Sequence, residues 1–142
     1  MRRLPILPDG TGKGRALHAG SCLCGAIRFT VAVPLPPPDI CHCRMCRKQS
    51  GHCFASTDVP KTAVTVQDAA GALVWYASSE TIRRGFCGTC GSTLFWEPLH
   101  RDWIAVAMGA FDGPTGTRAD KHIFVGEQGD YYMIADGLPQ RR

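Results

Sequence analysis

Three cysteines lie within six residues of one another, at Cys41, Cys43 and Cys46. At this spacing the thiols are too close to pair efficiently as disulfides, but they are well placed to surround one soft cation such as zinc. His42 lies between two of them and, by alternation of side chains, is expected to point away from the ion. The spacing therefore predicts a metal site with three strong protein ligands.

A second set of thiols consists of Cys22 and Cys24, followed 63 residues later by Cys87 and Cys90. The two-residue spacer in Cys87-Gly88-Thr89-Cys90-Gly91 points both sulfurs at one ion, and the glycines let backbone N–H groups turn toward the thiolates. Four soft ligands close a tetrahedral site, so we expect a structural zinc here. A redox pair at Cys87 and Cys90 would need a helix after the motif, whereas residues 91–96 have the pattern of a strand.

The Cys41 set differs because no fourth cysteine is obviously placed for it. Zinc with three protein ligands and one open position is the arrangement that acts on substrates, and three thiolates would make it a mild Lewis acid. His52 or Cys53 would close the site if either supplied a fourth ligand, although Cys53 is expected to be a small buried residue in a strand. Three neighbouring cations would either offset the thiolate charge or lie exposed on a short helix: Arg44, Arg47 and Lys48.

Composition indicates a globular protein of one domain, with 142 residues, 44% hydrophobic and 20% charged. No apolar run approaches the roughly 20 residues of a membrane helix, and no apolar segment follows the basic start, so we expect a cytoplasmic protein with reduced cysteines. Residues 1–16 carry a charge of +3 and Arg141 and Arg142 add +2, which leaves −1 of the net +4 for the body. A body without basic excess argues against nucleic-acid binding.

The elements that must position these cysteines are short strands. Residues 1–17 lack periodicity and predict a flexible arm, and Ala26–Val33 alternates as a half-buried strand. Arg44–Ser50 predicts a short helical turn that Gly51 ends. Other runs of strand-favouring residues follow, at residues 52–56, 63–66, 73–77, 81–86, 93–96, 103–108 and 122–125. Since long amphipathic helices are absent, the sequence predicts an all-β single domain of antiparallel strands over residues 18–142.

Five segments together resemble a known family: residues 20–29, 41–48, 86–92, 122–125 and 136–139. They resemble the glutathione-dependent formaldehyde-activating family, which also includes the domain of centromere protein V. The resemblance implies an all-β fold, sometimes called a β-tent, with two zinc ions per chain. It implies a structural zinc on Cys22, Cys24, Cys87 and Cys90 and a second, exchangeable zinc on Cys41, Cys43 and Cys46.

The family activity joins glutathione to formaldehyde as S-(hydroxymethyl)glutathione, a carbon–sulfur bond-forming addition classed with the lyases. The resemblance thus implies a small-molecule thiol and an aldehyde as partners, and the oligomeric state is not predicted. Where members often carry Lys and Trp after the His-Ile-Phe-Val motif, this chain has Gln128 and Tyr131. Without that lysine, a glutathione carboxylate would lose one partner.

Two functional hypotheses follow from the sequence. The first is a zinc-dependent enzyme that adds a thiol, glutathione in the first place, to a small aldehyde. The second is a non-catalytic zinc module that is structural or that binds a partner protein or nucleic acid through the same scaffold, with the neutral body arguing against nucleic acid. His122 is a candidate for the substrate pocket or for supporting the zinc ligands, with a structural role in a strand as the equal alternative.

Overall fold

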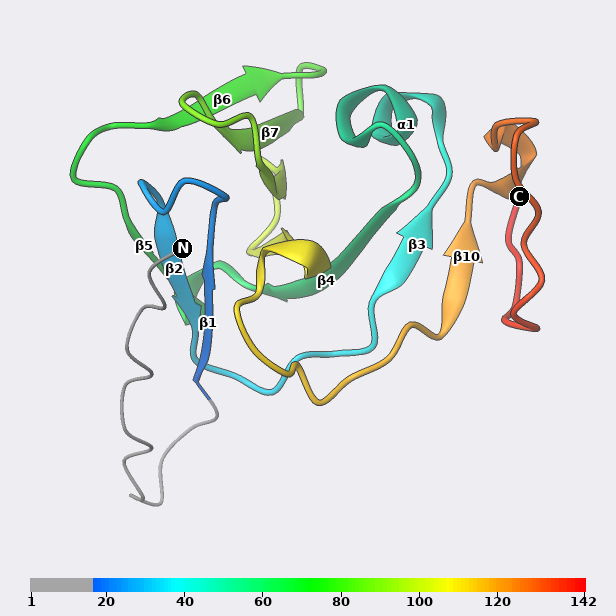
Figure 1. The fold of residues 1–142 in the computed structure, drawn as a ribbon, viewed down its shortest axis with the longest axis horizontal. Helices are drawn as coiled ribbons and strands as arrows, with labels where there is room; N and C mark the ends of the chain where they lie inside the picture. The colour runs from blue at the N-terminus through cyan, green and yellow to red at the C-terminus, as the bar shows by residue number, and fades with distance from the viewer. Residues whose placement is uncertain (1–16) are drawn as a thin grey trace.

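The computed structural model describes residues 17–142, which form two β-sheets and one short α-helix (Figure 1). The smaller sheet has the antiparallel order β1-β2-β5, with β1 at His18–Ser21, β2 at Arg28–Val31 and β5 at Val64–Gln67. Residues 1–16, and with them nearly all of the predicted arm, lie outside the described part of the chain.

The larger sheet has seven strands in the order β10-β3-β4-β9-β8-β7-β6. Their bounds are β3 Asp39–Cys41, β4 Phe54–Pro60, β6 Leu73–Ala77, β7 Ile82–Cys87, β8 Thr93–Pro98, β9 Trp103–Ala107 and β10 Lys121–Ile123. All pairs are antiparallel except β10 with β3, which is parallel. In Figure 1, β10 and the C-terminal segment lie at one side of the molecule and the smaller sheet at the other.

One α-helix, α1 (Arg44–Ser50), follows β3. Cys43 caps its start, since the sulfur accepts a hydrogen bond from the Cys46 N–H, and Gly51 ends it with a left-handed φ of 81°. Three 3₁₀ turns complete the described elements: η1 Lys61–Ala63, η2 Met108–Ala110 and η3 Val125–Glu127. Among the described residues, no helix has the length and apolar character that crossing a membrane requires.

The predicted all-β fold and the short helix at 44–50 are confirmed, with three differences. The strands β1 and β3 were not predicted, because each is too short for a periodic pattern. The parallel pairing of β10 departs from the expected antiparallel arrangement. β10 also ends at Ile123 rather than continuing to Val125, because Phe124 adopts a left-handed backbone with φ 54°.

The larger sheet separates two apolar clusters. On one face, alternate residues of β4 and β9 such as Val59, Ile104 and Val106 pack with Phe29 and Val31 of the smaller sheet to form the main core. On the other face, Phe54 and Ala107 pack beneath α1 with Cys41 and Cys46. Because side chains alternate along a strand, these two strands build both clusters at once.

Candidate metal centres and the adjoining cavity

The first cysteine set is assembled from both sheets. Cys22 and Cys24 lie between β1 and β2, Cys87 ends β7, and Cys90 lies in the turn before β8. All four sulfurs lie within 4.8 Å of one another, and all eight cysteines of the chain are free. The structure therefore brings together the four residues that the sequence grouped.

The spacing of these sulfurs fits a tetrahedral ion. Cys22 Sγ lies 3.6 Å from Cys24 Sγ, which in turn lies 3.8 Å from Cys87 Sγ. A tetrahedron with zinc–sulfur bonds of about 2.3 Å has edges of about 3.8 Å. The distances are also far too long for disulfides. The donor set thus fits a closed zinc site.

Nearby polar groups hold the first set in place. The Ile27 N–H donates to Cys22 Sγ at 3.3 Å, and Ser92 Oγ accepts from the Leu23 N–H at 2.9 Å and lies 3.2 Å from Cys90 Sγ. These contacts with Ser92 lower the pKa of Cys90 to about 5, which favours the thiolate that metal binding needs. Ser92 therefore links the two halves of the set.

The second set is local and holds three donors. The sulfurs of Cys41, Cys43 and Cys46 lie within 4.8 Å of one another. No other Cys, His, Asp or Glu among residues 17–142 brings a ligand atom within that distance of all three. His52 is exposed and bonds to the Tyr131 hydroxyl at 2.8 Å instead, and Cys53 stays outside the set. Neither of the two alternative fourth ligands is in place.

A cavity of about 370 Å³ adjoins the second set, and all three of its cysteines line it. The volume lies within the range of small-molecule sites. Its walls combine aromatic and apolar side chains with carboxylates and two arginines, as follows: Phe54, Trp96, Trp103, Ile123 and Phe124; Asp39, Asp58 and Glu127; Arg44 and Arg84. The open side of a three-cysteine site thus faces a space of the right size for a substrate.

Arg84 is the residue at this site that sequence reasoning missed. It is only 4% exposed, and its guanidinium donates to Cys46 Sγ at 3.7 Å, to Gln49 Oε1 at 3.1 Å and to Ser78 Oγ at 3.2 Å. The hydrogen bond with Cys41, supported by Arg84, lowers the pKa of Cys46 to about 6. The signal in the sequence was an arginine inside a predicted strand, at residues 81–86, where alternate side chains face the buried side of a sheet.

The three cations expected beside the set have different positions. Arg44 lines the cavity, and its backbone N–H donates to Glu127 Oε2 at 2.8 Å. Lys48 faces a different hollow, on the side of α1 next to Tyr76. Arg47 Nε is buried and has no hydrogen-bond partner among the described residues. The cation that donates a hydrogen bond to one of these thiols is instead Arg84, from β7.

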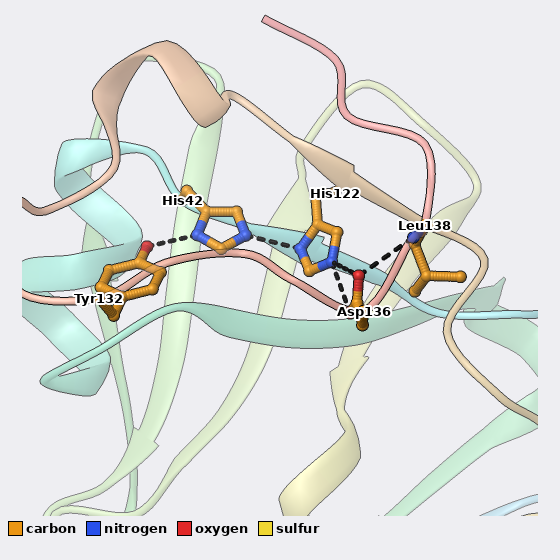
Figure 2. A network of polar contacts seen from close by, with 5 residues as sticks. All are labelled: His42, His122, Tyr132, Asp136 and Leu138. Atoms are coloured by element: carbon orange, nitrogen blue, oxygen red, sulfur yellow. Dashed lines mark hydrogen bonds and ion pairs between the residues drawn. The ribbon is translucent and has the colours of Figure 1, made fainter.

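His42 points away from the cysteines, as expected, into a chain of polar contacts (Figure 2). Its Nδ1 contacts the Tyr132 hydroxyl, and its Nε2 lies 2.8 Å from His122 Nδ1, while His122 Nε2 lies 2.9 Å from Asp136 Oδ2. Asp136 can only accept, so with both imidazoles neutral the order is fixed: Tyr132 donates to His42, His42 to His122, and His122 to Asp136. Burial, and then His122, lower the pKa of His42, in agreement with a neutral ring.

This series of polar contacts attaches the C-terminal segment to β3, the strand that carries Cys41. His122 is 4% exposed and lines a separate hollow with Tyr132 rather than the cavity beside the cysteines. The two departures from the family pattern lie in the same region: Gln128 Nε2 donates to the Tyr132 carbonyl at 3.0 Å, and Tyr131 contacts His52. Neither Gln128 nor Tyr131 lines the cavity.

Comparison with known proteins gives consistent results. The sequence model of the glutathione-dependent formaldehyde-activating enzyme family matches residues 17–127. An uncharacterized lyase of Schizosaccharomyces pombe is 28% identical over 84% of this chain and 86% of its own. A Halomonas elongata protein with the provisional name glutathione-dependent formaldehyde-activating enzyme is 35% identical over 83% of this chain and 81% of its own. A Rhodobacter sphaeroides protein of known crystal structure shares the fold, with a TM-score of 0.58 and 22% identity over 68% of this chain and 89% of its own.

Proposed function

The chain belongs to the glutathione-dependent formaldehyde-activating enzyme family, and on that basis we propose that it is a zinc-dependent enzyme that adds a thiol to a small aldehyde. Glutathione and formaldehyde are the substrate pair that the family suggests. The observation that carries the proposal is the difference between the two cysteine sets: four donors in the first, but three in the second, all lining a cavity. We assign the first set to a structural zinc, held by Cys22, Cys24, Cys87 and Cys90. We assign the second set to the zinc that contacts the substrate, held by Cys41, Cys43 and Cys46.

The addition is a balanced two-component reaction. The thiol sulfur forms a bond to the aldehyde carbon, the second bond of the carbonyl group breaks, and the thiol proton ends on the aldehyde oxygen. A zinc ion held by Cys41, Cys43 and Cys46 would act as a Lewis acid that favours the thiolate form of the substrate. No oxidant or reductant is needed.

The chain's own residues contribute position and charge. Cys41, Cys43 and Cys46 would hold the zinc ion at the cavity wall, which would place a substrate thiol beside an aldehyde in the same cavity. Arg84, which donates to Cys46 Sγ, would offset part of the negative charge of the three thiolates. Phe54, Trp96 and Ile123 give the wall beside the thiols an apolar surface, which would limit access of water to the reacting groups.

Exchange spectroscopy of glutathione with formaldehyde tests the proposal. The zinc-loaded wild type should accelerate interconversion with S-(hydroxymethyl)glutathione, and Cys46→Ser should lose the acceleration because the second set is left with two thiols. Cys53→Ser is the matched control, since it removes a thiol outside both sets. No acceleration by wild type carrying two zinc ions would overturn the enzymatic proposal for this pair and favour a non-catalytic zinc module.

A further inference from the structure

The strand register of the larger sheet determines which residues meet at one end of the cavity. Asp58 of β4 and Trp96 of β8 both lie opposite Ala105 of β9, whose small side chain leaves the space between them open. Trp103 lies two residues before Ala105 on the same face and stacks on Trp96, with ring centroids 5.6 Å apart and an interplanar angle of 24°. All four residues line the cavity.

Asp39 joins this group from β3. It lies opposite Ser56, and Asp58 is two residues further along the same strand, so the two carboxylates are diagonal neighbours on one face. Among the described residues, neither carboxylate forms an ion pair. Lys121 lies opposite Asp39 in the register, but its ammonium pairs with Asp120 at 3.1 Å.

Of the two arginines that line the cavity, Arg84 is bonded to groups outside this cluster. The Arg84 guanidinium donates to Cys46, Gln49 and Ser78. Burial raises the pKa of Asp39 and of Asp58, the charge of Asp39 raises that of Asp58 further, and the charge of Lys121 lowers both in part. A bound cation would reverse both shifts, because an opposite charge favours the carboxylate.

We propose that Asp39, Asp58, Trp96 and Trp103 form a subsite, here called the ammonium subsite, for the positively charged amine of the thiol substrate. Two carboxylates that line the same cavity as a stacked pair of indoles would provide ion pairing and cation–π attraction to a cation there, which an anionic or neutral group would lack. The inference rests on the proposed function and specifies its substrate class: a thiol that carries a primary ammonium group, as glutathione does at its γ-glutamyl end.

The subsite also sets the direction of the bound thiol. With its sulfur at the Cys41 set, glutathione would place its ammonium between the indoles and the carboxylates. Its γ-glutamyl carboxylate is bonded to the same carbon as the ammonium, so it would lie beside the subsite, on the side away from Asp39 and Asp58. This direction needs no lysine at position 128, and the Gln128 side chain is used on the Tyr132 carbonyl outside the cavity.

Two probes that differ at the amine test the subsite by binding alone. S-methylglutathione cannot react at sulfur, and its N-acetyl derivative lacks the ammonium charge. With the zinc-loaded protein, the indole N–H resonances of Trp96 and Trp103 should shift with the first probe, and N-acetylation should weaken binding about tenfold. Trp75 is the internal control, because it packs on Phe95 and Arg83 outside the cavity.

Charge variants separate the lost ammonium from the added bulk. In Asp39→Asn and Asp58→Asn, N-acetylation should cost less than about threefold, whereas Asp130→Asn, at an exposed position outside the cavity, should leave the tenfold difference unchanged. Circular dichroism verifies that each variant is folded. Equal binding of both probes to the wild type, or the same tenfold loss in the Asp39 and Asp58 variants, would overturn the subsite.

A rate measurement distinguishes this inference from the proposed function. The zinc-loaded enzyme should accelerate addition of glutathione to formaldehyde more than addition of N-acetylglutathione, which lacks the ammonium charge, relative to each uncatalysed rate. Equal acceleration of both would reject the subsite while keeping the enzyme. Acceleration of no thiol at all would reject the proposed function, and the binding experiment would still decide the subsite.

Discussion

The two cysteine sets use the same ligand chemistry for opposite structural purposes. The first joins segments 63 residues apart, and Cys22 and Cys87 are 3% and 0% exposed within the main core. The second lies within six residues on the other face of the larger sheet and lines a cavity. A link between distant segments restricts the unfolded chain more than a local one, so the first set should govern stability and the second should govern chemistry.

Removing one ligand from each set gives the largest expected contrast. Cys87→Ser should unfold the protein or cost several kcal/mol, since it removes a buried ligand at the junction of the sheets. Cys41→Ser should lose one zinc ion and keep the fold. Urea unfolding with metal analysis of each purified variant measures both effects. Equal loss of stability in the two variants would contradict the division of roles.

Metal removal should separate the sets without mutation. A weak chelator is expected to remove one zinc ion per chain from the three-donor set while the circular dichroism spectrum stays unchanged. A strong chelator should then remove the second ion and unfold the domain. If both ions leave together in one unfolding step, the sets are not independent.

The first set was largely predictable from sequence, and the reason is physical. Short spacers such as Cys87-Gly88-Thr89-Cys90 determine local geometry, and two pairs of cysteines supply the four soft donors that one tetrahedral ion needs. The strands around it alternate over enough residues to be recognised. What the sequence could not show is that Ser92 joins the halves, because that contact depends on the turn bringing it to Leu23.

The surroundings of the second set were less predictable. The cysteines are local, but the cavity is built from eight elements, and the order of its six strands in the sheet cannot be inferred from any one of them. Arg84 comes from β7, and the series of polar contacts that begins at His42 ends on Asp136, 94 residues later in the sequence. β3 itself has only three residues, too few for a pattern. Contacts across a sheet depend on register, and register appears only in the folded chain.

Arg84 offers a finer test of the second set. Arg84→Gln should weaken retention of the exchangeable zinc by about 10 to 100-fold, because the thiolates lose their buried counter-charge. Arg84→Lys should lose less, since the charge remains but one ammonium cannot reproduce the three contacts of the guanidinium. Competition with a chromogenic chelator measures the affinity. The first zinc serves as the internal reference, and equal weakening of both ions would contradict the assignment.

The backbone conformation near the two cysteine sets differs in a way that allows a test with the smallest expected effect. Beside the first set, left-handed positions are glycines, Gly25 and Gly91, with φ 79° and 78°. Beside the cavity, Phe124 adopts φ 54° despite its side chain, half of which is exposed at the cavity wall. A non-glycine residue in this region costs about 1 to 2 kcal/mol, so the ring is kept where the backbone opposes it.

Paired substitutions at position 124 separate the ring from the strain. Phe124→Gly and Phe124→Ala both remove the ring and should weaken thiol binding equally, but the glycine variant should be more stable than the alanine variant by about 1 kcal/mol. Gly91→Ala supplies the comparison at the first set: nothing lies within 4 Å of the added Cβ, so its cost of about 1 kcal/mol would be that of the backbone alone. Denaturant unfolding and thiol titration measure the two properties. If the strained backbone at position 124 serves the cavity, stability and thiol binding should change independently in the two variants. A loss of thiol binding in proportion to the loss of stability would show that Phe124 only supports the fold.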